Sequence, residues 1–216
     1  MNILLDLDGT LTDPYDGIAA SIHHAMAALG EPLPPDIDLG PCIGPPLDRS
    51  FAAFLETDDE VRIQAAIDAY REHFPDVMTS GNRLYDGVHD VMQALTDDGH
   101  QLFLATSKPL VYAVEIIDHF GLTPMFEGLY GSELNGERSD KADLIAYLLL
   151  AEDLAPDETL MVGDREHDVA GAFAAGVSCA GVLWGYGSRE ELLNAGADWL
   201  LEHPAELAEL DWLYES

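Results

Sequence analysis

The sequence predicts an α/β protein: a doubly wound parallel sheet with a small all-helical unit inserted after the first strand. From Tyr85 onward, short apolar runs alternate with stretches of helical periodicity, which favours parallel strands joined by right-handed helical crossovers. Residues 14–81 instead combine helical patterns with a proline-rich connection. The predicted domains are therefore a core of residues 1–13 and 82–216 and a helical unit of residues 14–81.

The first strand and the insertion follow from short-range patterns. Ile3-Leu4-Leu5 is a brief apolar run of the kind that forms a buried strand in a covered parallel sheet. Helical periodicity is expected over three stretches of the insertion: 16–29, 47–55 and 59–74. The prolines of 31–46 exclude a long helix between the first two of these. The buried face of the third is expected at four positions: Val61, Ala65, Ala69 and Phe74.

The remaining core elements are delimited by glycine and proline. Strands are expected at 101–106, 159–163, 177–183 and near 199–201. Helices are expected at 88–98, 109–120 and 169–175, with a short acidic helix at the end of the chain. Gly99, Gly121 and Gly176 follow the three helices, as expected of C-terminal stops.

Composition limits the classes of partner. The 216 residues are 48% hydrophobic and 23% charged, which is ordinary for a globular protein. The formal net charge is −32, from 9 basic and 41 acidic residues. Such a surface repels nucleic acid backbones and anionic lipid, so neither a polynucleotide nor a membrane partner is expected. The acidity fits either an ordinary solvated surface or adaptation to high salt.

Cellular location and assembly are predicted from what the sequence lacks. No apolar stretch approaches the 18 residues of a membrane span, and no signal peptide precedes Asp6. Cys42 and Cys179 do not make a disulfide framework, and each is expected to be a packed thiol. We therefore expect a cytoplasmic protein that is a monomer or a homodimer.

Two carboxylates, those of Asp6 and Asp8, follow the first predicted strand and are two residues apart. Because residues two apart on a strand point the same way, Asp6 and Asp8 can face one site at its carboxyl end. Carboxylates so close repel each other, so one must take up a proton or a cation must lie between them. The pair suits a nucleophile beside a general acid with a metal ion. The alternative is a strand end followed by an Asp-Gly turn.

Polar residues gather at three further places next to predicted strands or helices. They are Thr106-Ser107-Lys108, then Lys141, then Gly163-Asp164 with Asp168. Each has an ordinary explanation as a helix cap, a surface lysine or a turn. Their shared position at one edge of a parallel sheet favours a common site. Lys108 and Lys141 are the two lysines of the whole sequence, which favours sites where a compact positive charge is needed.

Taken in order, these motifs resemble a known family. Asp6-x-Asp8-Gly9-Thr10, Thr106 after a strand, Lys141, and Gly163-Asp164-x-x-x-Asp168 resemble the four motifs of the haloacid dehalogenase superfamily. Residues 14–81 are similar to the helical cap of that superfamily.

Shorter stretches resemble one branch of the superfamily. Gly44-Pro45-Pro46-Leu47 is similar to the cap loop of the phosphoglycolate phosphatases. The stretches 131–136 and Gly185-Tyr186-Gly187-Ser188 resemble relatives labelled 5′-nucleotidase or phosphoglycolate phosphatase.

The resemblance implies a role for each matching residue. Asp6 would attack phosphorus and become an aspartyl-phosphate, while Asp8 would protonate the leaving group and then activate water. Thr106 and Lys141 would stabilise the phosphoryl group. The implied cofactor is Mg²⁺, with metal ligands expected at four positions: Asp6, Asp8, Asp164 and Asp168. Further phosphate contacts are expected at five positions: Gly9, Thr10, Ser107, Lys108 and Arg49. Arg49 is equally well explained as a surface arginine.

The activity that the resemblance implies is hydrolysis of a small soluble phosphate ester. The expected substrates are phosphoglycolate or a nucleoside 5′-monophosphate. Asp8 argues against a dehalogenase, and the absence of lysine from 14–81 argues against a phosphonatase. A phosphosugar mutase similar to β-phosphoglucomutase stays open, as does a non-catalytic module that binds phosphate esters.

Overall fold

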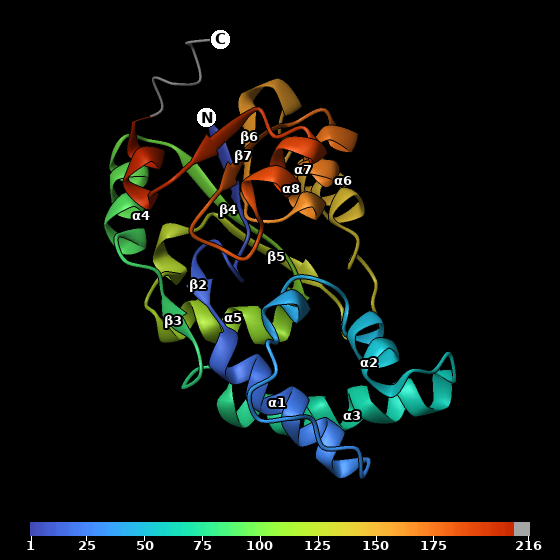
Figure 1. The fold of residues 1–216 in the computed structure, drawn as a ribbon. Coiled ribbons are helices and arrows are strands. Elements are labelled where there is room, and N and C mark those ends of the chain that lie inside the picture. Colours follow the sequence, from blue (N-terminus) through green and yellow to red (C-terminus); the bar gives the residue numbers. More distant parts are fainter. Residues whose placement is uncertain (210–216) are drawn as a thin grey trace. The chain divides into compact units, whose positions relative to one another are not determined.

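The computed structural model describes residues 1–209, which form two compact units (Figure 1). The first comprises Met1–Asp13 and, among the described residues, 84–209. The second is Pro14–Arg83. Within residues 1–209, no helix combines the length and apolar character needed to cross a membrane.

The first unit is built on one sheet of six strands. Its order is β5-β4-β1-β6-β7-β8, and every pairing is parallel. The strands are β1 (Asn2–Leu5), β4 (Gln101–Pro109), β5 (Gly128–Ser132), β6 (Thr159–Gly163), β7 (Ser178–Val182) and β8 (Trp199–Leu201). The predicted parallel α/β fold is confirmed.

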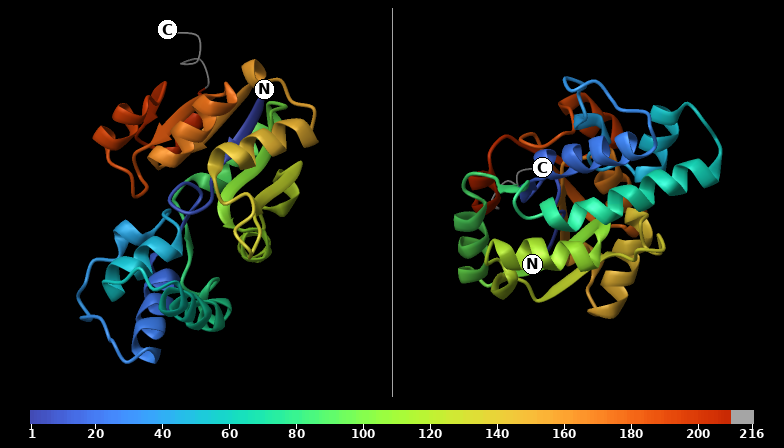
Figure 2. Two further views of the ribbon diagram at one scale, coloured as in Figure 1. Left: turned by 90° about the vertical axis from the view of Figure 1, so that its right-hand side faces the viewer. Right: turned by 90° about the horizontal axis from the view of Figure 1, so that it is seen from below.

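Helices cover both faces of this sheet (Figures 1 and 2). One face carries α4 (Val88–Asp97) and α5 (Leu110–His119); the other carries α6 (Lys141–Ala151), α7 (Glu166–Ala175) and α8 (Arg189–Ala195). Leu4, Phe103 and Met161 pack in one buried cluster with residues of α6, α7 and α8. The strands are apolar on both sides because no face of a doubly wound sheet meets water. Single turns of 3₁₀ helix lie at Thr123–Met125 and Pro156–Glu158, with a longer one at Pro204–Ala208.

The register of the sheet brings the site together. Leu5 of β1 lies opposite Leu104 of β4 and Val162 of β6. The next residue of each strand is therefore Asp6, Ala105 or Gly163, and the three share the carboxyl edge of the sheet. Two short strands, β2 (Thr12–Asp13) and β3 (Arg83–Leu84), pair where the chain leaves the first unit and returns to it.

The second unit is helical, with α1 (Tyr15–Ala28), α2 (Leu47–Leu55), α3 (Glu60–Val77) and a 3₁₀ turn at Gly40–Cys42. Both α1 and α2 pack on α3. The ends of the unit meet at Gly17 and Gly81, where the Gly17 amide donates to the Gly81 carbonyl at 2.9 Å. A β-carbon on Gly81 would lie 2.5 Å from the Gly17 nitrogen, so this approach requires glycine.

The predicted buried face of α3 is wrong. Val61 is 78% exposed and Ala65 is exposed, whereas Phe74 is buried as expected. The buried residues of this helix are Ala66, Ile67, Tyr70 and Phe74. The aromatic residues decide the face, because Tyr70 stacks on Phe74 and meets the edge of Phe51 from α2.

Several helix ends also differ from the prediction. The helix α7 begins at Glu166, three residues before the expected start at 169, and the bounds of α1, α4 and α5 differ by one residue. The helix α3 continues through Pro75 to Val77, three residues beyond the expected end at Phe74. An acidic helix was expected at the end of the chain; the described residues there contain the 3₁₀ turn Pro204–Ala208, and the rest of that expectation falls on residues 210–216, outside the described part.

Candidate active site

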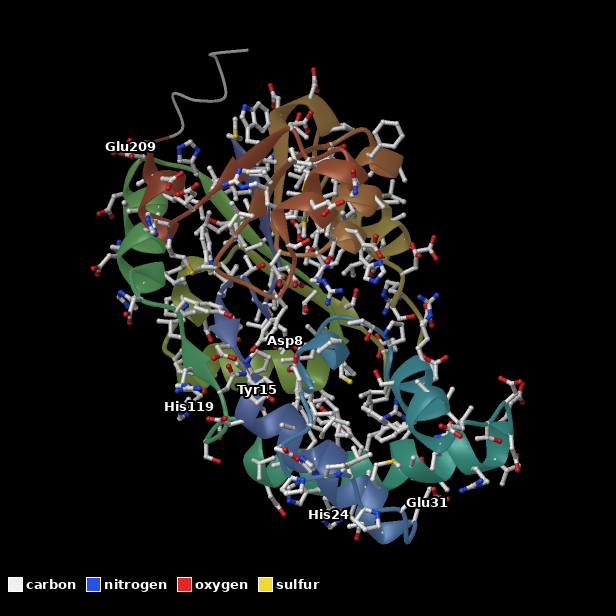
Figure 3. The ribbon with its side chains drawn as sticks, in the orientation of Figure 1. Asp8, Tyr15, His24, Glu31, His119 and Glu209 are labelled. Atoms are coloured by element: carbon white, nitrogen blue, oxygen red, sulfur yellow. The ribbon has the colours of Figure 1, made fainter. Side chains whose placement is uncertain are left out.

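The loop after β1 is a tight turn that depends on Gly9. The Leu7 carbonyl accepts from the amides of Thr10, Leu11 and Thr12 at 3.2, 2.9 and 3.0 Å. Gly9 has φ +88°, and a β-carbon there would lie 2.5 Å from Asp164 Cγ. Glycine therefore lets the loop carry Asp8 just beyond the end of β1 (Figure 3) and lets Asp164 approach.

Asp6 belongs to a buried charge cluster with Lys141. The Lys141 ammonium lies 2.9 Å from Asp6 Oδ1 and 2.7 Å from Asp168 Oδ1, and it donates to the Ala105 carbonyl at 2.8 Å. Lys141 is the first residue of α6, which Asp140 caps by accepting from the Ala142 amide at 2.9 Å. Lys141 therefore makes two hydrogen bonds, to Asp6 and Ala105, and an ion pair with Asp168, whose Oδ1 has no hydrogen-bond partner. These three oxygens offset the cost of burying the ammonium.

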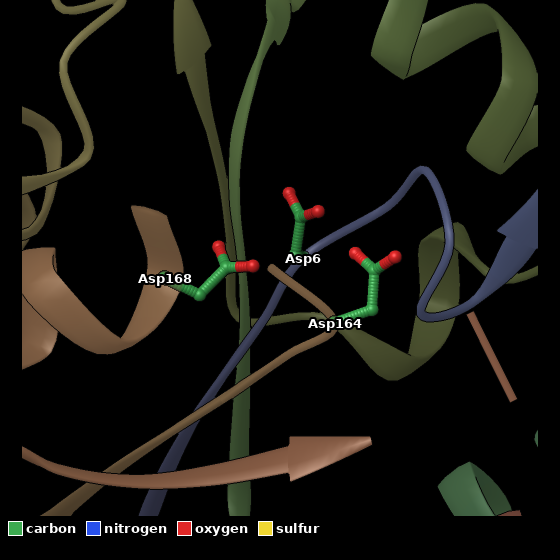
Figure 4. A group of neighbouring side chains, drawn as sticks. All are labelled: Asp6, Asp164 and Asp168. Carbon is green, nitrogen blue, oxygen red and sulfur yellow. The ribbon is translucent and has the colours of Figure 1, made fainter. Parts of the chain in front are cut away.

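Three buried carboxylates converge at the same edge of the sheet (Figure 4). One oxygen from each of Asp6, Asp164 and Asp168 lies within 4.8 Å of the others. Asp164 Oδ2 accepts from the Tyr186 amide at 2.7 Å, but Asp164 Oδ1 is buried without a hydrogen-bond partner. A buried carboxylate oxygen that has no hydrogen-bond partner and lies close to other carboxylates is the kind of ligand that a hard divalent cation prefers. The residues present therefore fit the predicted Mg²⁺.

The electrostatics of the cluster point the same way. Burial, followed by repulsion from Asp168 and Asp6, holds the pKa of Asp164 well above its ordinary value. Burial acts to lower the pKa of Lys141, but Asp168 and Asp6 raise it overall, so the side chain remains an ammonium. One ammonium cannot balance three carboxylates, and a bound cation would remove the remaining imbalance.

Asp8 has a cationic partner of its own. Lys108 Nζ lies 2.5 Å from Asp8 Oδ2, with the Lys108 side chain 6% exposed and that of Asp8 14% exposed. Burial raises the pKa of Asp8, and Lys108 opposes that shift. The two aspartates of the first motif are thus held by different lysines, Asp6 by Lys141 and Asp8 by Lys108. The expected phosphate contact of Lys108 stays a prediction.

The predicted hydroxyl of Thr106 lies within β4, which continues to Pro109 and does not end at the expected residue 106. Thr106 is 2% exposed, and its Oγ1 accepts from the Lys108 amide at 3.2 Å. The pairing with β5 shifts register after Thr106, and Ser132 of β5 fixes the irregular segment by donating to the Ser107 carbonyl at 2.8 Å. Thr10, expected as a phosphate contact, is buried, and its Oγ1 has no hydrogen-bond partner.

The family follows from comparison of the whole chain. Residues 3–182 match the family model described as haloacid dehalogenase-like hydrolase. The chain belongs to this family.

Three curated relatives of this hydrolase have informative names. A Pseudomonas aeruginosa protein named 5′-nucleotidase is 47% identical over 193 residues, covering 88% of this chain and 86% of the relative. A Mycobacterium tuberculosis protein named tyrosine-protein kinase PtkA is 35% identical over 208 residues, covering 96% and 70%. A Vibrio vulnificus protein named phosphoglycolate phosphatase is 28% identical over 220 residues, covering 96% and 94%.

A solved structure of the family matches nearly every residue. The crystal structure of a predicted phosphatase from Clostridium acetobutylicum has a TM-score of 0.92 and 37% identity, with 98% of each chain covered. The resemblance stated from the motifs is confirmed at the level of family and fold.

Arg49 is the one predicted site residue that lies in the second unit of this hydrolase. It is exposed in the first turn of α2, and its amide donates to the Pro46 carbonyl at 3.2 Å. Its contact with substrate stays a prediction.

The sequence identified 185–188 only as a stretch that resembles relatives, and it did not predict that these residues hold Asp164. A β-carbon on Gly185 would lie 2.5 Å from Asp164 Cβ, and one on Gly187 would overlap the Asp164 carbonyl oxygen. Between these glycines, the Tyr186 amide donates to Asp164. The signal was the Gly-x-Gly spacing after a strand, which is typical of close backbone approach.

Proposed function

We propose that this chain is a Mg²⁺-dependent phosphomonoesterase that works through an aspartyl-phosphate on Asp6. The observation that carries the proposal is the placement of Asp6. Asp6 Oδ1 lies 2.9 Å from the Lys141 ammonium, an Asp6 oxygen lies within 4.8 Å of an oxygen of Asp164, and Asp8 is two residues further along the chain. This grouping supports a nucleophile, a charge-stabilising ammonium and a cation site that act together at one edge of the sheet.

Each residue of the site has one task in this proposal. The Asp6 carboxylate attacks phosphorus, and Lys141 offsets the charge that Asp6 and the phosphoryl oxygens share. The Asp8 carboxyl gives a proton to the leaving oxygen and later takes one from water, with Lys108 orienting it. Thr106 donates its hydroxyl to a phosphoryl oxygen.

The cation has a definite set of candidate ligands. Asp6 and Asp164 would hold it together with the carbonyl of Asp8. Asp168, from α7, would instead keep its ion pair with Lys141. When bound, Mg²⁺ supplies a Lewis acid for the phosphoryl oxygens and lets an anionic substrate approach an acidic protein.

The substrate proposed is a nucleoside 5′-monophosphate or another small phosphate ester such as phosphoglycolate. Support comes from the relatives named 5′-nucleotidase and phosphoglycolate phosphatase, the first being much more similar to this chain. We propose that residues 14–81 act as a cap that selects among these esters, with Arg49 as one contact.

A substrate panel tests the proposal. Phosphate release is measured from nucleoside 5′-monophosphates, phosphoglycolate, hexose phosphates and p-nitrophenyl phosphate, with Mg²⁺ and with EDTA. We expect Mg²⁺-dependent release that Asp6→Asn abolishes and Asp97→Asn leaves unchanged. Asp97 is the matched control because it is an exposed carboxylate that pairs with Gln93 on α4. Full turnover by Asp6→Asn would rule out the nucleophile.

The same panel separates the alternatives. A mutase would convert hexose 1-phosphate to an isomer without releasing phosphate, which phosphorus NMR detects. A binding module would retain ligand without turnover. The relative named a tyrosine-protein kinase adds an arm with ATP and a tyrosine peptide, in which phosphopeptide would form in place of free phosphate.

A further inference from the structure

The segment that follows β7, residues 183–188, contacts both the loop after β1 and Asp164. Trp184 Nε1 donates to the Thr10 carbonyl at 2.9 Å, which ties the segment to the loop after β1. Gly185 and Gly187 lie against Asp164, and neither position has room for a β-carbon. The segment 183–188 therefore follows any displacement of Asp164 closely.

Tyr186 makes two polar contacts that point to different parts of the chain. Its amide donates to Asp164 Oδ2 at 2.7 Å, and its hydroxyl donates to Asp13 Oδ1. Burial, and then the hydrogen bond to Asp13, raises the pKa of Tyr186 above its ordinary value, so the hydroxyl stays protonated and remains the donor. One residue thus bridges a candidate metal ligand and the end of β2.

Asp13 is the last residue of the first unit before the chain enters the second. It belongs to β2, which pairs with β3 at the point of return, and nearby the Tyr85 amide donates to the Leu11 carbonyl at 3.1 Å. Because Pro14 follows, the α conformation of Asp13 is disfavoured and its backbone has few alternatives. We therefore expect a displacement of the Asp13 side chain to move the backbone that connects the two units.

We propose that Tyr186 is a positioning residue that couples the occupancy of Asp164 to the chain connection at Asp13. A displacement of Asp164 on binding a cation would move the Tyr186 amide, and the rigid ring would carry that displacement to the hydroxyl and to Asp13. The connection formed by residues 10–13 and 82–86 is then more firmly held when the metal is bound. The inference rests on the proposed function for the metal at Asp164, and it adds a link from that metal to the joint of the proposed cap.

Tyr186→Phe isolates the link, because it removes only the hydroxyl and keeps the ring and the amide. Hydrogen exchange is followed by mass spectrometry over residues 10–13 and 82–86, with and without Mg²⁺ alone, and Mg²⁺ affinity is measured by calorimetry. We expect Mg²⁺ to slow exchange of the connection in the unmodified protein by about 2- to 10-fold, the range that one net hydrogen bond supports. In Tyr186→Phe this slowing disappears while the Kd for Mg²⁺ changes less than threefold.

Tyr130→Phe is the matched control. Tyr130 is also partly buried, and its hydroxyl also donates to a carboxylate, Glu152, away from Asp164 and Asp13. This variant keeps the Mg²⁺-dependent slowing, whereas Asp13→Ala, which removes the Tyr186 contact from the other side, loses it. A merely structural role for Tyr186 would speed exchange equally with and without Mg²⁺.

Each other result is decisive. Slowing that persists in Tyr186→Phe overturns the coupling, and so does a Kd that rises tenfold in that variant, because Tyr186 would then act on the metal site alone. If the unmodified protein binds Mg²⁺ without any change at the connection, the coupling is wrong and the proposed function stands. If it does not bind Mg²⁺, the proposed function fails and the coupling with it.

Discussion

At the scale of single residues, the site is organised as two separate carboxylate–ammonium pairs. Asp6 and Asp8 are two positions apart, yet Lys141 holds the first and Lys108 the second. Lys141 also forms an ion pair with Asp168. In the proposed mechanism, this separation would let Asp6 remain a charged nucleophile while Asp8 exchanges a proton.

Asp8→Asn should divide the proposed reaction into its two steps. With p-nitrophenyl phosphate the leaving group needs no proton, so the first step continues and the aspartyl-phosphate forms. Without a base for water the second step slows by about 10²- to 10⁴-fold. Stopped-flow absorbance should therefore record a burst of about one p-nitrophenolate per active site, followed by slow turnover.

Asp6→Asn is the control for this burst, because it lacks the proposed nucleophile and should release none. A uniform loss of rate without a burst in Asp8→Asn would show that Asp8 acts mainly in the first step.

At the scale of elements, helices α6 and α7 approach so closely that one residue decides their contact. A β-carbon on Gly171 of α7 would lie 2.7 Å from Lys141 Cγ and 2.9 Å from the Lys141 carbonyl carbon. Since Lys141 is also fixed by Asp6 and Ala105, it has no room to retreat. The charge cluster and the packing of these two helices therefore depend on each other.

Gly171→Ala should destabilise the fold although alanine favours helix. Overpacking of this kind costs about 1–3 kcal/mol, which exceeds the gain of about 1 kcal/mol from helix propensity. Urea unfolding followed by circular dichroism measures the difference.

The matched change is Ala174→Gly at an exposed position of the same helix. It should cost about 0.5–1 kcal/mol through propensity alone. Stabilisation by Gly171→Ala would show that α7 can move away from Lys141.

Short-range patterns predicted some elements with their exact bounds. Strands β6 and β8 and helix α2 have the expected bounds. Strand β5 was missed because Gly128 and Gly131 weaken its strand signal, although a β-carbon on Gly131 would lie 2.8 Å from the Lys108 carbonyl oxygen. Helix α8 was also missed, although the Ser188–Glu191 spacing is that of an N-terminal cap, and Ser188 Oγ does accept from the Glu191 amide.

The sequence could predict only those site residues whose side chains have obvious chemistry. Asp6, Lys141, Asp164 and Asp168 were named from the sequence, and the structure brings them together. The contacts of Ala105 and Tyr186 are made by backbone atoms, which any residue could supply. Nor does the sequence pair Lys108 with Asp8, because that contact spans 100 positions and depends on the order of strands in the sheet.

At the scale of the whole molecule, the dominant feature is a charge of −32 on 216 residues. Like charges at this density repel one another in the compact state, and that repulsion opposes folding. Salt shortens the reach of the repulsion from about 30 Å at 0.01 M to about 8 Å at 0.15 M.

Raising NaCl from 0.01 to 0.3 M in the presence of EDTA should therefore raise the Tm. Screening worth about 1 kcal/mol would shift the Tm by about 2–4 °C in a domain of this size. Scanning calorimetry measures the shift.

Tetramethylammonium chloride at equal ionic strength should give the same rise, because screening is independent of the cation. A Tm that does not change with salt would show that the acidic groups are neutralised within the fold.

Both lysines of the chain are enclosed in the site, with side chains 6% and 4% exposed. Reagents that acylate primary amines at neutral pH should therefore find the terminal amine of the chain and little else. A dye or a solid support joined to the protein in this way would be attached at a single known point. The residues that serve the proposed chemistry would be spared, since the same ion pairs that hold them also shield them from the reagent.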